Sequence, residues 1–294
     1  MKRRKKILAG VLSAVLFFSS SAYAREGVVQ IKGSDTLINL VQRLSEVYMR
    51  KKSGSAIAVT GGGSGTGIAA LINGKCDIAN ASRDIKGKEI EQAVANGVDP
   101  KRIVVAIDGL SVIVNNSNPL KQLTMGEIGQ IFRGEITNWK ELGGNDEPVT
   151  LYGRQSNSGT FVLFMELVLK ADYSPKMRRM NGNSQIVEAV KSDKTGIGYV
   201  GVGYVKNEPD VTVLKVAQER GGVYASPLNV EDVKTGKYPI ARPLNQYVNG
   251  SPEGAIRDFI AFELSPEGQA IVEEDGFFTV PPEYMEYNRK NAGL

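Results

Sequence analysis

Short β-type runs that end at glycine and precede a helical pattern are the feature that most constrains this chain. Residues 28–32 and 56–60 are two such runs, and each is followed directly by glycine. Between residues 37 and 48, apolar side chains recur at the spacing of one helix face. A chain that alternates strand and helix in this way is typical of an α/β fold with a mostly parallel sheet covered by helices.

The alternation continues to the C-terminus. Further strands are expected at residues 76–79, 103–107, 110–114, 149–152 and 197–205, and further helices at 68–71, 161–169, 256–264 and 270–274. No low-complexity segment divides the chain into two independent halves. We therefore expect two compact lobes crossed by more than one chain segment.

The N-terminus predicts an export signal over residues 1–24. Residues 2–6 are all Lys or Arg, an apolar run covers residues 7–18, and Ala22-Tyr23-Ala24 forms a small-residue cleavage site. The apolar run is too short to span a bilayer comfortably. We therefore expect cleavage near Ala24 and a periplasmic or secreted mature protein of 270 residues, without direct membrane insertion.

The amino-acid composition excludes several kinds of catalytic and metal site. The chain has no histidine and one cysteine, Cys76, so a Ser-His-Asp triad, a His-ligated metal and an intrachain disulfide are excluded. Five of the 36 basic residues lie in 1–24, which leaves 31 basic against 32 acidic residues. Nothing in that balance indicates a nucleic-acid partner. We expect no cofactor and no metal.

Three loops between a predicted strand and a predicted helix combine glycine with hydroxyl side chains, at residues 33–36, 63–67 and 154–160. A helix start offers unpaired backbone N–H groups and a partial positive charge, and glycine lets an anion approach them. Alone, each loop reads as an ordinary helix cap. Together with Arg154, whose guanidinium suits a tetrahedral oxyanion, they predict an anion site. Residues 61–67 lack the Lys-Ser/Thr ending of a nucleotide phosphate loop.

These segments resemble a known family. The 33–36 and 63–65 loops, the stretch 77–83 and the pattern Arg154-x-x-x-Ser158-Gly159-Thr160 resemble phosphate-binding proteins of the PstS type, the extracytoplasmic subunits of phosphate ABC transporters. The segment 131–139, which ends at Trp139, resembles a structural signature of the same family, and Trp139 is expected in the core. The resemblance covers nearly the whole mature chain.

The resemblance implies a type 2 periplasmic-binding-protein fold, with two lobes that each hold a mixed, mostly parallel sheet flanked by helices. Lobe 1 would comprise residues 25–109 plus 242–294, and lobe 2 residues 110–241. The two crossings of the hinge are expected near 108–110 and 239–242. It also implies capture of inorganic phosphate for an ABC transporter permease by a monomer that is not an enzyme.

The resemblance also implies the site. The candidate phosphate-binding residues are Ser34, Asp35, Thr36, Ser64, Ser82, Arg83, Asp108, Arg154, Ser158, Gly159 and Thr160. Well-known members carry an aspartate after an Ala-Ser pair, and it accepts the phosphate proton. Here Ser82 or Arg83 stands in that place, so Asp35 and Asp108 are the candidate acceptors. This departure keeps sulfate, molybdate or tungstate open as ligands, with an exported phosphatase-like enzyme as a weaker alternative.

Overall fold

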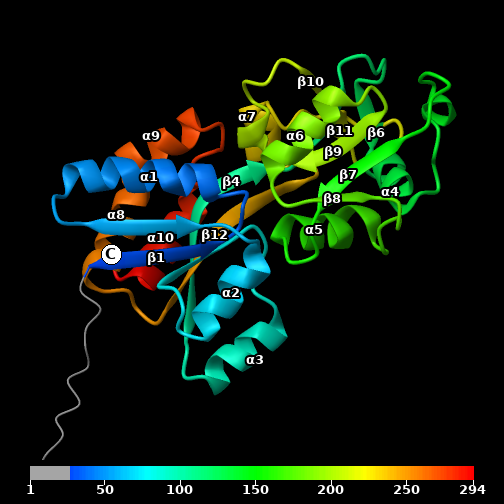
Figure 1. The fold of residues 1–294 in the computed structure, drawn as a ribbon. Coiled ribbons are helices and arrows are strands. Elements are labelled where there is room, and N and C mark those ends of the chain that lie inside the picture. The colour runs from blue at the N-terminus through cyan, green and yellow to red at the C-terminus, as the bar shows by residue number, and fades with distance from the viewer. Residues whose placement is uncertain (1–26) are drawn as a thin grey trace, which may run out of the picture.

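The computed structural model describes residues 27–294, so the predicted export signal lies outside the described residues. Two five-stranded sheets dominate the structure, with strand orders β2-β1-β3-β12-β4 and β10-β5-β9-β7-β8 (Figure 1). The first sheet consists of β1 (Val28–Gly33), β2 (Ala56–Thr60), β3 (Ile78–Ala81), β4 (Pro100–Gly109) and β12 (Ala241–Asn249). The second consists of β5 (Ser111–Asn115), β7 (Thr150–Arg154), β8 (Arg178–Met180), β9 (Gly196–Val200) and β10 (Val211–Val213).

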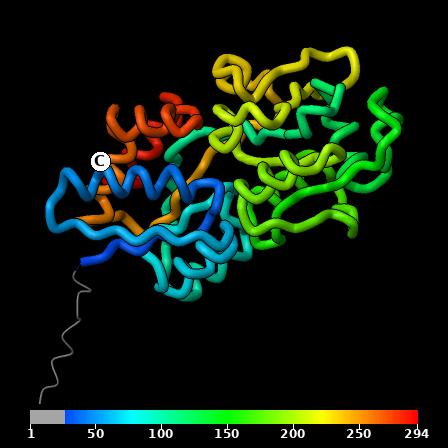
Figure 2. The backbone as a smooth tube through the Cα atoms, turned by 45° about the horizontal axis from the view of Figure 1, so that its top comes forward, coloured from blue at the N-terminus to red at the C-terminus, as the bar shows by residue number. Residues whose placement is uncertain are grey.

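Helices flank both sheets, which gives two lobes side by side (Figure 2). With the first sheet lie α1 (Ile38–Lys51), α2 (Ser64–Ile72), α3 (Gly87–Ala95), α8 (Gly254–Glu263), α9 (Pro266–Glu274) and α10 (Pro282–Ala292). With the second lie α4 (Met125–Arg133), α5 (Gly159–Phe164), α6 (Asn183–Ser192), α7 (Val230–Lys234) and the short pair β6 (Gln122–Thr124) and β11 (Lys215–Ala217). None of the described helices is long and apolar enough to cross a membrane.

Strand directions confirm the predicted mixed, mostly parallel sheets. In the first sheet β1 pairs in parallel with β2 and β3, while β12 runs antiparallel to both β3 and β4. Strand β12 is therefore the one strand that opposes the other four. In the second sheet β5 is the strand that opposes the other four. It runs antiparallel to β9 and β10, while β7 pairs in parallel with β8 and β9.

The chain crosses between the sheets twice, and the two crossings are neighbours. It leaves the first sheet after Gly109, enters the second at Ser111, and returns before Ala241. The backbone N–H of Leu110 donates to the carbonyl of Ile240 at 2.9 Å. This arrangement confirms the predicted two-strand connection.

Several predicted elements have other bounds than expected. The helix expected at 68–71 starts earlier, as α2, and the strand expected at 76–79 starts at Ile78, as β3. The strand expected over 197–205 stops at Val200, and residues 202–204 form a 3-10 turn, η3 (Val202–Tyr204). The N–H of Val202 donates to the Asp108 carboxylate at 2.8 Å, so it is not free for a strand ladder. The helix expected over 161–169 begins as α5 and continues as a π-helical turn, η2 (Met165–Leu169).

The single tryptophan and the single cysteine have structural roles. Trp139 is 1% exposed, and its indole N–H donates to the Thr195 carbonyl at 3.0 Å, which confirms its place in the core of the second lobe. Cys76 is buried just before β3. Burial raises the pKa of its thiol to about 12, so the thiol stays protonated and unreactive at neutral pH.

Candidate anion-binding site

The hydroxyl-bearing loops of the two lobes meet in the structure. Thr36 follows β1 and Thr160 follows β7, and their Oγ1 atoms lie 3.0 Å apart. Ser82, which follows β3, places its Oγ 3.4 Å from Thr160 Oγ1 and 3.3 Å from Ser64 Oγ. These four side chains are almost completely buried. We call Thr36, Ser64, Ser82 and Thr160 the hydroxyl cluster.

Glycine permits this close approach of the lobes. A Cβ at Gly159 would lie 2.3 Å from Ser64 Oγ, and one at Gly63 would lie 2.7 Å from the Asn157 carbonyl. The same carbonyl accepts a hydrogen bond from the N–H of Gly65 at 3.0 Å. Gly63 directly precedes α2, and Gly159 is the first residue of α5. The backbones of these two helix starts therefore face each other across the lobes.

Several hydroxyls around the cluster already accept a hydrogen bond from a nearby backbone N–H. The bonds run from Thr36 N to Ser34 Oγ (3.2 Å), from Ser82 N to Ser64 Oγ (3.0 Å) and from Phe161 N to Ser158 Oγ (3.4 Å). A hydroxyl that accepts from a fixed donor keeps its own proton for another partner. The arrangement therefore favours a ligand rich in acceptor oxygens.

Arg154 supplies the buried positive charge. Its side chain is 1% exposed, and its Nη2 donates to Asp35 Oδ2 at 2.5 Å and to the Asn181 carbonyl at 2.9 Å. Its Nε and Nη1 are buried without a hydrogen-bond partner among residues 27–294. Burial lowers the pKa of Arg154, and the Asp35 carboxylate opposes that shift, so the guanidinium stays charged. Two unpaired N–H-bearing nitrogens on a buried cation require an anionic or strongly accepting partner.

The two candidate proton acceptors differ in how many bonds they already make. Asp108 is fully buried, and its Oδ2 accepts from Arg242 Nε at 3.0 Å and Nη2 at 2.8 Å. Its Oδ1 accepts from Val202 N. Asp35 is partly exposed, and each of its carboxylate oxygens accepts one hydrogen bond. Its Oδ1 accepts from Gly62 N at 2.8 Å, and its Oδ2 accepts from Arg154 Nη2. Since a carboxylate oxygen can accept two hydrogen bonds, Asp35 keeps more free capacity.

Arg83 pairs with a carboxylate of its own lobe, whereas Ser82 belongs to the hydroxyl cluster; the Nε of Arg83 is buried without a hydrogen-bond partner among residues 27–294. The Arg83 guanidinium makes a bidentate pair with Glu89, with both N···O distances at 2.7 Å. Burial raises the pKa of Glu89, but the hydrogen bonds from Arg83 and from Lys86 N more than offset that effect and leave the pKa below its ordinary value. The charge of Arg83 is therefore balanced within the first lobe.

The sequence did not single out Arg242 or Asn157. Arg242 is 3% exposed on β12, and its Nη2 donates to Thr160 Oγ1 at 3.0 Å. Asn157 Nδ2 donates across the lobes to the Gly62 carbonyl at 2.8 Å. The available signal for Arg242 was a charged residue at the start of a strand that otherwise reads as buried, since such a charge needs partners.

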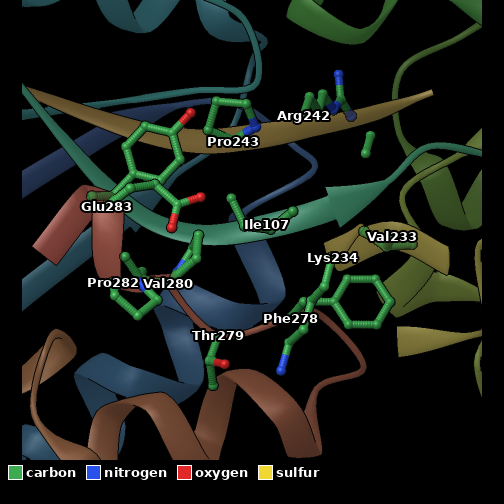
Figure 3. Close-up of a pocket in the computed structure, with 13 residues that line it drawn as sticks. Ile107, Val233, Lys234, Arg242, Pro243, Phe278, Thr279, Val280, Pro282 and Glu283 are labelled. Carbon is green, nitrogen blue, oxygen red and sulfur yellow. The ribbon is translucent and has the colours of Figure 1, made fainter. Parts of the chain in front are cut away.

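A separate cavity lies on the hinge side, where the C-terminal segment covers β4 and β12 (Figure 3). Its lining is mainly apolar and includes Ile107, Val233, Pro243, Phe278 and Val280. Arg242 lies at its edge, but that guanidinium is already paired with Asp108. This cavity lacks the converging donors of the hydroxyl cluster and is not the candidate anion site.

Two α/β lobes joined by two adjacent crossings, with buried hydroxyls and a guanidinium between them, define the periplasmic-binding-protein class. The family model described as the PBP superfamily domain matches residues 20–267. Within this class, the chain belongs to the family of PstS-type phosphate-binding proteins.

The relatives that show this membership match nearly their whole length. The chain is 32% identical over 280 residues to the phosphate-binding protein PstS of Pseudomonas aeruginosa, which covers 89% of this chain and 86% of the relative. It is 31% identical to PstS of Bacillus subtilis, with 95% of each chain covered. A phosphate ABC transporter substrate-binding protein from Clostridium perfringens, solved with bound phosphate, has 34% identity and a TM-score of 0.78 over 87% of this chain and 100% of its own.

Proposed function

We propose that this protein captures inorganic phosphate between its two lobes outside the cytoplasmic membrane and delivers it to the permease of an ABC transporter. The observation that carries the proposal is the buried Arg154 guanidinium, whose Nε and Nη1 lack partners among the described residues beside the hydroxyl cluster. Family membership and the phosphate bound to the Clostridium perfringens relative support the choice of ligand.

The proposed ligand contacts come from both lobes. Lobe 1, residues 25–109 plus 242–294, would contribute Ser34, Thr36, Ser64 and Ser82, and lobe 2, residues 110–241, would contribute Arg154, Ser158, Gly159 and Thr160. Arg83 is assigned to the wall of the site through its pair with Glu89. A ligand that bridges both lobes shifts them toward closure by its differential affinity for the closed form.

The charges around the proposed site balance formally. Arg154 pairs with Asp35, and Arg242 pairs with Asp108. Affinity must then come from directed hydrogen bonds rather than from excess positive charge. A micromolar dissociation constant needs roughly 8 kcal/mol. Hydrogen bonds to charged groups contribute about 1.5–3 kcal/mol each, so a handful of them reaches that value after ordering costs.

We assign the role of proton acceptor to Asp35 rather than Asp108. Asp108 already accepts three hydrogen bonds and is fully buried, whereas each Asp35 oxygen accepts one. A protonated oxygen of phosphate is a donor, and sulfate at neutral pH offers only acceptors. An acceptor beside Arg154 would therefore favour hydrogen phosphate over sulfate.

The protein would act without catalysis, as an exported monomer whose export signal, residues 1–24, is removed. The relatives it resembles are named as phosphate-binding or phosphate transport proteins. The partner would be a membrane permease, with no insertion of the mature chain itself.

Isothermal titration calorimetry on the phosphate-stripped mature protein tests the proposal. We expect one-to-one phosphate binding with little sulfate binding at several pH values. Sulfate, molybdate or tungstate binding of equal or greater strength would replace phosphate as the ligand. Release of product from a chromogenic phosphate ester would overturn the assignment to transport alone.

A further inference from the structure

Thr160 is the point where both lobes and the crossing strands meet. Its Oγ1 lies 3.0 Å from Thr36 Oγ1 of the first lobe and accepts a hydrogen bond from Arg242 Nη2 at 3.0 Å. Thr160 and Thr36 are completely buried, and Arg242 is 3% exposed. No proposed phosphate contact includes Arg242, although it bonds directly to one of the proposed donors.

Arg242 is held firmly on the first-lobe side. Its Nε and Nη2 donate to Asp108 Oδ2, and its Nη1 donates to the Ser82 carbonyl at 2.8 Å. Asp108 and Arg242 face each other in the β4–β12 ladder, so the backbone also fixes their separation. With the bond to Thr160, four N–H groups of this guanidinium have partners, and the side chain has little freedom to turn away.

The direction of the Arg242–Thr160 bond has a chemical consequence. A guanidinium can only donate, so Thr160 Oγ1 must accept, and its own proton must point to another acceptor. The neighbouring oxygens of Thr36 and Ser82 belong to hydroxyls that can accept this proton or donate their own, so without a ligand the three hydroxyls compete for the same few acceptors. An anion at the hydroxyl cluster is the partner that satisfies all of these donors together.

We infer that Arg242 is a positioning residue for anion capture: it commits the hydroxyl proton of Thr160 to the bound ligand and links that bond to the crossing strands. This inference rests on the proposed function and deepens it. Arg242 acts through Thr160 and need not touch the ligand. Asp108 holds the guanidinium in place and is not itself the proton acceptor.

A second bond connects the same ion pair to the second lobe. The N–H of Val202 donates to Asp108 Oδ1 at 2.8 Å. Val202 and Thr160 both belong to the second lobe, whereas Asp108 and Arg242 lie on the two crossing strands. Parting of the lobes would break the bonds from Val202 and to Thr160 but leave the Asp108–Arg242 pair intact. The pair therefore supports the closed form, in which Thr160 faces the ligand.

A double-mutant cycle tests the inference. The variants are Arg242→Gln, Thr160→Val and both together, with the dissociation constant for phosphate measured by calorimetry. Each single change should weaken binding by at least about tenfold, because each removes one oriented donor. The double variant should bind within about threefold of Thr160→Val alone, because Arg242 acts through that hydroxyl. If Arg242 had a purely structural role, the fold-change in the dissociation constant of the double variant would instead equal the product of the two single fold-changes.

Arg102→Gln is the matched control. Arg102 also bonds to β12, with its Nε 2.9 Å from Asn245 Oδ1, but its recorded bonds stay within the first lobe. The dissociation constant of Arg102→Gln for phosphate should lie within about twofold of the parent value. Thermal unfolding without phosphate checks that each variant folds. If Arg242→Gln does not fold, Arg242→Lys enters the same cycle, since it keeps the charge but loses the planar fork.

The outcomes separate the two proposals. If the parent protein does not bind phosphate, the proposed function fails. If the parent binds phosphate and a folded Arg242 variant binds it equally well, the inference about Arg242 is overturned while the function stands. Multiplied effects in the double variant would likewise overturn it.

Discussion

Arg154 and Asp35 form an ion pair between the lobes, with the Nη2 of Arg154 2.5 Å from Asp35 Oδ2. Arg154 ends β7 of the second sheet, and Asp35 follows β1 of the first. The pair neutralises the guanidinium formally but occupies only Nη2, which leaves Nε and Nη1 without partners in the described structure. The same residue can therefore hold the lobes together and offer donors to a ligand.

Replacement of Arg154 should strongly weaken phosphate binding. Arg154→Lys keeps the charge but loses the fork of donors, so we expect the dissociation constant to rise by about tenfold or more. Arg178→Lys is the control, because Arg178 bonds to Tyr152 on the same sheet and not to the hydroxyl cluster. Calorimetry on both variants measures the effect. Equal affinities for Arg154→Lys and the parent would contradict the site assignment.

Replacement of Asp35 should change ligand preference more than overall affinity. Asp35→Asn loses one acceptor and gains donors next to Arg154. We expect phosphate binding to weaken and sulfate binding to weaken less or to improve, so the ratio of the two dissociation constants moves toward one. Loss of the Asp35–Arg154 pair should change the dissociation constants of both ligands alike. Loss of the proton acceptor should change only their ratio. An unchanged ratio of the two dissociation constants would show that Asp35 does not accept the phosphate proton.

A methyl group at Gly159 should block closure without unfolding the protein. The added Cβ would lie 2.3 Å from Ser64 Oγ and 2.9 Å from Ser82 Oγ, both on the opposite lobe. Gly159→Ala should raise the dissociation constant for phosphate by more than about tenfold, while helix α5 tolerates alanine. Gly87→Ala is the control, because nothing lies within 4 Å of the Cβ position there. Normal binding by Gly159→Ala would show that the lobes need not approach so closely.

Glu263 should make stability depend on pH. It is fully buried, and burial raises its pKa to about 8 against an ordinary value of 4.5. Gln246 Nε2 donates to Glu263 Oε1 at 3.0 Å, while Glu263 Oε2 and Gln246 Oε1 have no hydrogen-bond partner in the part of the chain described. A protonated carboxyl could donate from Oε2 to the amide oxygen, so the folded state should hold this proton.

The unfolded chain releases that proton at lower pH than the folded protein does. The free energy of unfolding should therefore fall as pH rises from about 4.5 to about 8, and level off above. Glu263→Gln should remove this part of the pH dependence, while Glu286→Gln, at an exposed position, should keep it. Chemical denaturation over this pH range measures both. Parallel pH profiles for the parent and Glu263→Gln would show that Glu263 is ionised in the folded protein.

Local sequence was enough to predict the strand–loop–helix units, although the helices after the second and third loops begin inside those loops, at Ser64 and Gly159. Gly159 and Thr160 open α5 directly after a cap at Ser158, and Ser64 opens α2 after three glycines. Such positions depend on interactions within a few residues, which the spacing of glycine and hydroxyl residues reveals. The mostly parallel sheets follow from the alternation of elements, since parallel neighbours require helical crossovers.

The partners of the charged residues could not be derived in the same way. Sequence left Ser82 and Arg83 as alternatives, and the structure separates them because Glu89, in the first turn of α3, pairs with the guanidinium of Arg83. Sequence also left Asp35 and Asp108 equivalent, and Asp108 is distinguished by its burial and by its bonds from Val202 and from Arg242, which lies 134 residues later. The sequence by itself thus determined the strand–loop–helix units around the site and the donors in their loops. Only the tertiary structure decided which charge meets which, because hydrogen-bond partners across lobes depend on strand register and packing rather than on neighbouring residues.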